Sequence, residues 1–494
     1  MRRHALAAAL TGFALRLGFI RFFPSVGDDS ALYLQLARNL LYGHTYGLIQ
    51  RGRMMPTDVR PPGYPLFLAA VEWLAGPAPA TLFVAQSVLD LVGCFLVAAL
   101  AARLAPLSSR ERVWIAALWL ACLCPFVANY TAVALTEVLA VFLTTVTLLL
   151  LVRAWQREEL AGVDCDRMGW LAAGAAAGLA TLVRAESPLL LAAAGTAIFL
   201  ACARRRQWLR IARTGIWLAA GLLLPLLPWG IRNTAALGRM QILAPRYAQM
   251  AGDFVPRGFN AWTNTWLVRF RDVYLVPWRI GREPLSMDDQ PSYAFDSQAE
   301  RGRVAHLFAE YDKKLVITPL LDRQFAELAR ERERRHPLRT WLWVPLERVA
   351  TIWLTPRVEL LPYSGQIFPL PSEWEDDRED LLVSLGLCLV NALFLLLAAA
   401  GCWKILAQRR RAAVWTRRPW LPGLAGMALP PGAMFLVAYL LLRTAFLTRV
   451  ETPEPRYVLV CFPAVIALAA QCWQRRLEMQ EEPAEPQSAP VPAD

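Results

Sequence analysis

Residues 381–406 read LLVSLGLCLVNALFLLLAAAGCWKIL, and this stretch decides the kind of fold that the chain can adopt. No charged side chain interrupts it before Lys404. A helix needs about 20 residues to cross a hydrocarbon layer of roughly 30 Å. Because no water is present there to satisfy free backbone groups, a helix is the expected form. The stretch therefore predicts a transmembrane helix.

Apolar blocks of this kind recur along the whole chain. Hydrophobic residues make up 56% and charged residues 19% of the 494 residues, which is too little charge for the surface of a soluble domain. We expect an all-α polytopic membrane protein of about 10–12 transmembrane helices. The candidate spans are 5–23, 80–102, 113–128, 131–152, 169–183, 187–203, 211–230, 381–406, 420–443 and 456–473. The first block resembles a signal peptide but has no small-x-small cleavage site, so we expect it to be retained as a helix.

The arginines predict the orientation of these spans. The net charge of +12 could indicate a nucleic-acid partner, but the arginines flank apolar blocks, which argues against one. All clusters of basic residues fall on one side of the membrane if segments 63–76 and 341–356 do not cross it. These clusters lie at the N-terminus, at 103–112, at 204–213, at 404–418 and after the last span. We therefore expect both termini in the cytoplasm. Segment 63–76 is then an interfacial or re-entrant helix, and 341–356 a helix on the outer surface.

This topology divides the chain into four parts. We expect residues 1–235 to form an N-terminal transmembrane module with an outer loop at 24–79, and residues 236–380 to form a mostly helical outer region. Within that region 298–335 has helical apolar spacing, interrupted at Pro319. Residues 381–476 supply the C-terminal transmembrane helices. The acidic, proline-rich tail 477–494 is predicted to be disordered.

The first outer loop carries the residues that indicate chemistry. Asp28 and Asp29 precede a stretch with amphipathic helical spacing that ends at Gly43, so Asp29 could cap that helix or act as a general base at the membrane surface. Further along the loop, Arg60 precedes the sequence Pro61-Pro62-Gly63-Tyr64-Pro65. The planar guanidinium fork of an arginine matches phosphate oxygens, although an interfacial arginine can also simply snorkel. The loop thus predicts an acid and a phosphate-binding cation close together.

Other charges lie at the outer ends of apolar blocks. Glu137, Arg184, Glu186, Arg232 and Arg456 come from separate stretches of the chain but share one depth in the predicted topology. Charges at such depth usually face a cavity, although Arg184 and Glu186 could also pair merely to fix helix packing. Independent capping or snorkelling gives no reason for acids and arginines to gather at one level. A site that binds an anionic lipid headgroup and performs acid–base chemistry does.

The ordered set of these motifs resembles the GT-C superfamily of glycosyltransferases, in particular the bacterial branch related to aminoarabinose transferases and protein O-mannosyltransferases. The matching residues are Asp28-Asp29 with Tyr33, Ala37 and 40–43; Arg60 to Pro65; Thr136-Glu137; 178–184; 228–233; and Pro455-Arg456-Tyr457. The resemblance covers 1–235 well and 240–450 poorly. It implies a GT-C-like fold with interfacial helices in the first outer loop, a polyprenyl-phosphate sugar donor, and transfer with inversion at the extracytoplasmic face. It also implies that the protein lies in the inner membrane of a bacterial cell, that 1–235 is the catalytic module, and that the outer region 236–380 is periplasmic.

The same resemblance assigns roles to the residues. It implies Asp29 as catalytic base, Asp28 as its alternative, and Glu137 as a second acid. The residues implied in substrate binding are Tyr33, Arg60, Tyr64, Arg184, Arg232, Arg456 and Tyr457. A divalent metal ion held by Asp29 and Glu137 is possible, but no cofactor follows firmly from the sequence. The acceptor stays open among a glycolipid, a glycan and a protein.

Two other classes of protein fit parts of the pattern. A lipid or sugar transporter, including a flippase, would also have many spans, but such proteins often show repeated halves and interrupted helices near the midplane. The chain has no internal repeat, and its acids gather at the outer surface instead. A non-catalytic assembly subunit with a large outer domain is the other alternative. The nine cysteines mostly lie within apolar blocks and form no CxxC pair, so we expect no disulfide framework or cysteine metal site.

Overall fold

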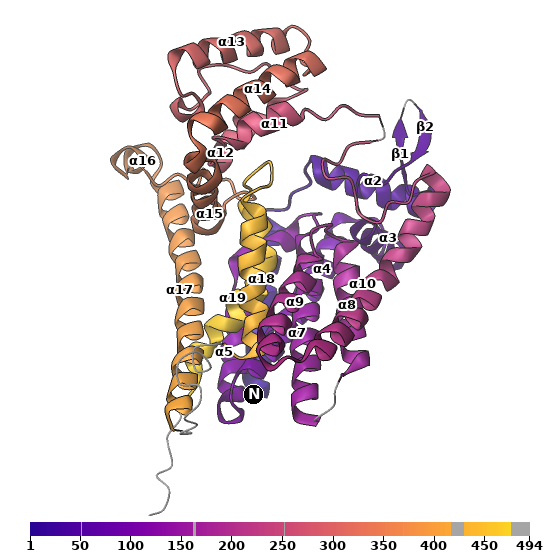
Figure 1. The fold of residues 1–494 in the computed structure, drawn as a ribbon, viewed down its shortest axis with the longest axis vertical. Coiled ribbons are helices and arrows are strands. Elements are labelled where there is room, and N and C mark those ends of the chain that lie inside the picture. The colour runs from indigo at the N-terminus through magenta and orange to yellow at the C-terminus, as the bar shows by residue number, and fades with distance from the viewer. Residues whose placement is uncertain (51, 162–164, 251, 369, 416–428, 476–494) are drawn as a thin grey trace, which may run out of the picture.

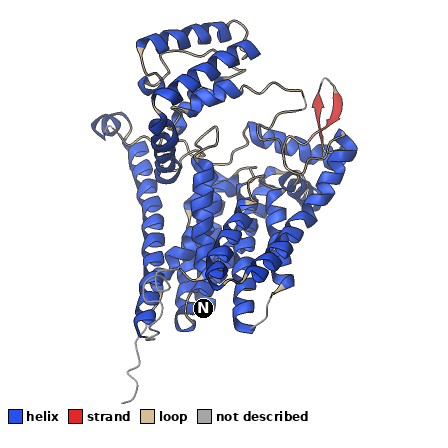
Figure 2. Ribbon diagram, viewed as in Figure 1, coloured by secondary structure: helices blue, strands red, loops and turns tan. Residues whose placement is uncertain are grey.

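The computed structural model describes the chain except residues 51, 162–164, 251, 369, 416–428 and 476–494. The described chain is almost entirely helical, with one short antiparallel hairpin (Figure 2). The predicted tail 477–494 lies outside the described residues. The structure confirms the prediction of an all-α polytopic membrane protein.

The long apolar helices coincide with the predicted spans. Within the described residues, six helices are long and apolar enough to cross a membrane: α1 (Arg2–Phe22), α4 (Pro79–Leu104), α7 (Glu137–Ala161), α10 (Trp208–Leu237), α17 (Arg378–Trp415) and the run Pro455–Trp473, which comprises η8, α19 and η9. The bent pair Leu107–Cys122 and Pro125–Ala132, which contains α5 (Arg110–Cys122) and α6 (Pro125–Ala128), counts as a seventh if it is one span. Two of the remaining predicted spans are the shorter helices α8 (Arg167–Thr181) and α9 (Leu189–Cys202). The predicted span 420–443 lies outside the described residues up to 428, and its later part falls in α18 (Pro431–Leu447).

The long helices lie side by side in one layer (Figure 1). The N-terminus lies at one end of this layer, together with the end of α17, whereas the outer-loop elements α2 and α3 and the region after α10 lie at the other end. We call the latter the loop-bearing end. The arginine clusters that are predicted to be cytoplasmic would lie at this N-terminal end. The side of the membrane that this end faces stays a prediction.

The first outer loop folds against the loop-bearing end. It contains α2 (Asp28–Gly43), the hairpin β1 (Gly47–Gln50) with β2 (Arg53–Pro56), and α3 (Gly63–Ala75). Our prediction of Asp29 as helix cap is wrong, because Gly27 occupies the N-cap and Asp29 is the second residue of α2. Since it is not used as a cap, the carboxylate of Asp29 is available for side-chain partners.

Residues 238–377 form the outer part of the molecule. It contains α11 (Arg257–Asn264), α12 (Phe270–Leu275), η4 (Pro277–Arg279), α13 (Gln298–Asp312), α14 (Pro319–Arg335), α15 (Val344–Leu354) and α16 (Leu370–Asp376). Its own hydrophobic core is centred on Phe259, Trp262 and Phe325. The predicted interruption at Pro319 is present, because α13 ends at Asp312 and α14 begins at Pro319. The predicted surface helix 341–356 corresponds mainly to α15, with Trp341 and Leu346 exposed.

Glycines bring α8 and α10 into backbone contact. A Cβ atom on Gly174 would lie 2.3 Å from the carbonyl oxygen of Leu218, and one on Gly221 would lie 2.2 Å from that of Leu171. Small residues at such crossings are typical of membrane helix pairs. This tight packing fixes the end of α8, immediately before Arg184.

Candidate active site

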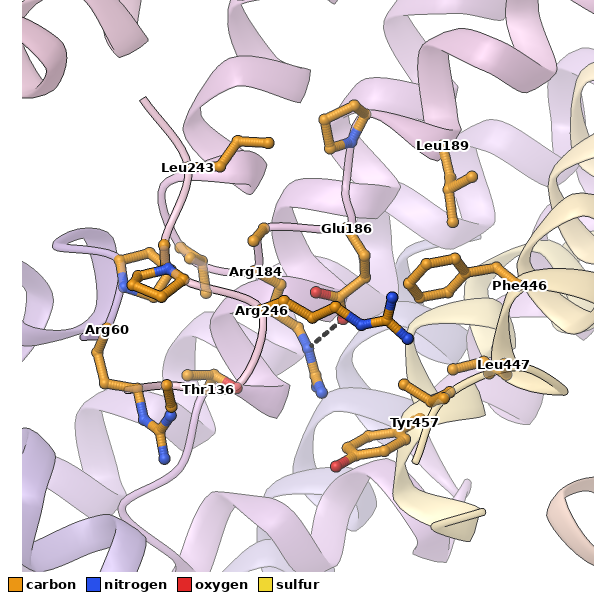
Figure 3. A pocket seen from close by; sticks show the side chains of 18 of the residues that line it. Arg60, Thr136, Arg184, Glu186, Leu189, Leu243, Arg246, Phe446, Leu447 and Tyr457 are labelled. Carbon is orange, nitrogen blue, oxygen red and sulfur yellow. Dashed lines mark hydrogen bonds and ion pairs between the residues drawn. The ribbon is translucent and has the colours of Figure 1, made fainter. Parts of the chain in front are cut away.

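A cavity of about 810 Å³ lies at the loop-bearing end, between the helix layer and the outer loops. One wall is apolar and comes from membrane-layer helices, with Leu189 and Ala192 on α9 and Phe446 and Leu447 on α18 (Figure 3). The other wall is charged. Among the described residues, it carries the arginines Arg60, Arg184, Arg246, Arg449 and Arg456 and the acids Asp29, Glu137, Glu186 and Glu451.

Asp29 connects two of these arginines. Its Oδ1 accepts a hydrogen bond from Arg60 at 3.0 Å, and its Oδ2 lies 3.6 Å from a guanidinium nitrogen of Arg456. The side chain of Asp29 is 42% exposed, so it stays accessible from the cavity. Arg456 is also paired with Glu454 on its other side. The first-loop acid predicted from the sequence therefore lies in contact with two of the predicted phosphate-binding arginines.

A second ionic cluster surrounds Arg184. Its guanidinium pairs with Glu137 at 3.3 Å and with Glu186 at 3.0 Å, and Glu186 in turn pairs with Arg443 of α18 at 3.0 Å. Burial alone would raise the pKa of Glu186, but Arg443 and Arg184 outweigh it and hold that pKa at about 2. Glu186 is thus ionised at neutral pH. Glu137 is 2% exposed, and its Oε2 has no hydrogen-bond partner among the described residues.

The predicted tyrosines divide between the cavity wall and its support. Tyr33 and Tyr457 line the cavity, where the guanidinium of Arg60 lies 5.9 Å from the ring centre of Tyr33 and that of Arg184 lies 5.4 Å from Tyr457. Tyr64 is fully buried behind Tyr33 in edge-to-face contact, and its hydroxyl donates to Gln86.

Arg232 also lies outside the cavity wall. Its guanidinium lies over the rings of Tyr46 and Trp229 and donates to the backbone carbonyl oxygens of Tyr46 and Thr57. Arg232 and Tyr64 therefore hold the first outer loop in place, and the structure does not bring them to the cavity. The side chain of Asp28 lies outside the described part of the structure.

Sequence reasoning missed several charged residues of this site. Arg443 lies inside an apolar span, and a charge at that position is itself a signal for a functional or structural partner. Glu454 could be recognised from the sequence only as part of the segment that opens the last span. Arg246 and Glu359 lie in regions without a recognisable motif. Arg246 pairs with Glu451 at 2.7 Å, which joins the segment after α10 to the segment after α18.

A second cavity of about 670 Å³ meets the first one. Both are lined by Asp29, Arg60, Leu135, Arg456 and Tyr457, so these five residues form the boundary between the two. The second cavity continues under the outer region, where it is lined by residues of α12 and η4. Asp29 thus faces two compartments, one with an apolar membrane-layer wall and one beneath the outer region.

The possible metal ion can be tested against this geometry. Asp29 pairs with arginines and Glu137 pairs with Arg184, so each carboxylate already faces a guanidinium. No group of three or more His, Cys, Asp or Glu side chains suited to a metal occurs among the described residues. The pair does not fit a divalent cation well, and we derive no step through one.

Part of the chain is similar in sequence to a known protein family. Residues 59–231 match the family model of dolichyl-phosphate-mannose-protein mannosyltransferases. No curated protein matches the chain.

The fold of this chain is similar to the folds of two proteins with solved structures. The Archaeoglobus fulgidus oligosaccharyltransferase AglB, in complex with an inhibitory peptide and a dolichol-phosphate, has a TM-score of 0.47 at 14% identity, covering 95% of this chain and 49% of that chain. ArnT from Cupriavidus metallidurans, bound to undecaprenyl phosphate, has a TM-score of 0.39 at 14% identity, covering 95% and 76%. The chain spans about half the length of the archaeal protein, and likeness at these scores carries no argument about chemistry.

The chain is therefore an all-α, multi-pass membrane protein whose residues 59–231 match a family of lipid-phosphate sugar transferases. This match bears out, over residues 59–231, the resemblance to protein O-mannosyltransferases that the sequence indicated. Arg60, Glu137 and Arg184 all lie within the matched segment, whereas Asp29 and Arg456 lie outside it.

Proposed function

We propose that this protein is a membrane glycosyltransferase that moves a sugar from a polyprenyl-phosphate-linked donor to an acceptor hydroxyl at the loop-bearing end, with inversion. The observation that carries the proposal is the first cavity, in which an apolar wall faces a charged wall with five arginines and four acids among the described residues. A ligand that fits both walls has a long apolar tail and an anionic head. The family match over 59–231 supports the same class of donor.

The proposed reaction is a single displacement at the anomeric carbon. The bond from that carbon to the phosphate oxygen breaks while a bond to the acceptor oxygen forms, and the acceptor proton passes to Asp29. The departing phosphate gains negative charge, which arginines stabilise without a general acid. A carboxylate that takes up the acceptor proton supplies general-base catalysis.

The arginines differ in how far their guanidinium groups are already engaged by carboxylates and so in how readily they can bind a phosphate. Arg60 uses one terminal nitrogen on Asp29, and its buried Nε has no partner among the described residues. Arg456 is shared between Asp29 and Glu454, and Arg184 is held by Glu137 and Glu186. We therefore assign the closest phosphate contact to Arg60, with Arg456 beside it and Arg184 as a more distant positive charge.

The test is consumption of a defined donor by the purified full-length protein in lipid vesicles. With a hydroxylated acceptor added, we expect polyprenyl-phosphate-linked sugar to yield free polyprenyl phosphate and the glycosylated acceptor, and we expect Arg60→Ala to weaken donor binding. A lipid transporter would move the donor between leaflets without consuming it, and an assembly subunit would do neither. Transbilayer movement with an intact sugar–phosphate bond would therefore refute the proposal.

A further inference from the structure

The second cavity has an aromatic wall that the proposed chemistry does not use. Phe270 and Tyr274 of α12 and Trp278 of η4 line it, and we call these three side chains the aromatic platform. The ring centres of Tyr274 and Trp278 lie 4.4 Å apart, and those of Phe270 and Tyr274 lie 5.0 Å apart. Tyr274 is 46% and Trp278 39% exposed, so each offers open ring surface. Large aromatic side chains left open in a cavity are typical anchors for a ligand.

Unpartnered polar atoms also lie around this cavity. Ser30 Oγ, Tyr130 OH and Glu359 Oε1 belong to residues of its wall, and these buried atoms have no hydrogen-bond partner among the described residues. Buried polar groups in folded proteins nearly always have partners, so several orphans around one cavity indicate a polar ligand. The set combines an acceptor with two hydroxyls that can donate or accept. Burial raises the pKa of Glu359, although Arg357 acts against that rise.

The charge of the second cavity is balanced. Among the described residues, its wall carries the arginines Arg60, Arg282 and Arg456 and the acids Asp29, Glu359 and Glu454. A phosphorylated or polyanionic ligand would find no excess of positive charge here, unlike in the first cavity, where the arginines outnumber the acids. The wall therefore suits a neutral, polar ligand.

We infer that the second cavity binds the acceptor and that this acceptor is a neutral saccharide. The apolar C–H face of a sugar ring packs against an aromatic face, and its hydroxyls both donate and accept, which matches the platform and the orphaned atoms. A hydroxyl of the bound saccharide reaches Asp29 at the boundary of the two cavities. Its oxygen forms the new glycosidic bond, and its proton passes to the carboxylate. This inference rests on the proposed function.

A peptide acceptor is the competing occupant. One common mode of peptide recognition adds the peptide as a strand to an exposed sheet edge. The described wall of the second cavity consists instead of short helices, loops and side chains. The observations thus favour a saccharide, and the experiment below makes the peptide an explicit outcome.

The test measures acceptor binding separately from turnover. The full-length protein in lipid nanodiscs is exposed to a panel of neutral di- to tetrasaccharides built from glucose, galactose, mannose and N-acetylglucosamine, and to a panel of Ser/Thr-containing hexapeptides. Binding is read by saturation-transfer NMR. We expect at least one saccharide to bind and Trp278→Ala to weaken that binding about tenfold. Trp374→Ala is the matched control, because Trp374 is 46% exposed in α16 and lines neither cavity.

A second variant distinguishes a specific loss of saccharide binding from misfolding of the protein. Glu359→Gln keeps the size of the side chain but changes its acceptor properties, and we expect it to weaken saccharide binding while polyprenyl phosphate still binds as in wild type. Binding of the peptide panel alone, no saccharide binding, or saccharide binding insensitive to Trp278→Ala would each overturn the inference. In these cases intact binding of polyprenyl phosphate and donor consumption would leave the proposed function standing. Loss of both would refute the proposed function itself.

Discussion

Replacement of Asp29 by asparagine is the sharpest test of the proposed mechanism. The substitution keeps the size of the side chain and can still accept a hydrogen bond from Arg60, but an amide cannot take up the acceptor proton. General-base catalysis is typically worth about 10²–10⁴-fold, so we expect turnover to fall by about that factor.

The effect on donor binding can be worked from the geometry. Asp29 lies 3.0 Å from Arg60 and 3.6 Å from Arg456, where it competes with a phosphate for both guanidinium groups. Because its side chain is 42% exposed, each ion pair is worth only about 1 kcal/mol after solvent screening. Removal of the charge should leave donor affinity unchanged or make it up to about fivefold tighter. The variant should therefore bind donor at least as well as wild type while turning it over slowly.

The assay combines donor binding with release of polyprenyl phosphate under saturating donor. Glu72→Gln is the matched control, since Glu72 pairs with Arg38 in the same outer loop, 3.4 Å away, but lines neither of the two cavities. We expect Asp28→Asn to have a smaller effect than Asp29→Asn. A dead Asp28→Asn beside an active Asp29→Asn would reverse the assignment. Normal turnover in both variants and in the double variant would refute a first-loop base, and Glu137 would be the next candidate.

Three further predictions follow from the same geometry. Arg60→Lys should weaken donor binding about tenfold, because an ammonium group loses the bidentate fork, and unchanged affinity in a direct binding assay would contradict the phosphate assignment. Glu186→Gln should lower stability at pH 7 by about 3 kcal/mol, since it leaves Arg443 without a carboxylate. The Glu186 pKa is held at about 2 against an ordinary 4.5, so this stabilisation is present above about pH 4.5 and is lost as pH falls toward 2; thermal melts of both proteins across that range should converge. Cysteine labels at 104–110, 204–210 and 408–418 should react from the cytoplasm and labels at 240–335 from outside, whereas outside labelling at 408–418 would make 341–356 a true span.

Hydropathy predicted most of the helix layer, because a helix that crosses a membrane needs a long uninterrupted apolar run. It failed in detail at 131–152, where the helix α7 begins only at Glu137. The residues before it form a 3-10 turn and an extended segment, with Val133 bridged to Ser25. These residues are apolar and buried, and composition alone does not distinguish a buried irregular segment from a helix.

The sequence predicted which charged residues belong to the site better than it predicted which of them form ion pairs with one another. Charges at the outer ends of apolar blocks are costly, so Glu137, Arg184 and Arg456 could be singled out. The pair between Glu186 and Arg443 joins residues far apart in the chain, and only tertiary packing brings them together. Arg232 was predicted at the site because an arginine can bind a phosphate, but stacking on aromatic rings and binding of backbone carbonyls are equally available to it.

The two cavities also bear on stereochemistry. With the donor in the first cavity and the acceptor in the second, the two substrates approach the anomeric carbon from different compartments, and Asp29 lies at the boundary on the acceptor path. A retaining reaction would need a carboxylate to attack the sugar and then an acceptor to enter on the side that the phosphate has left. That side is the first cavity, which in this proposal holds the donor lipid, so an acceptor could enter it only after the polyprenyl phosphate has left. Direct displacement by the acceptor needs no such rearrangement, which is why we propose inversion.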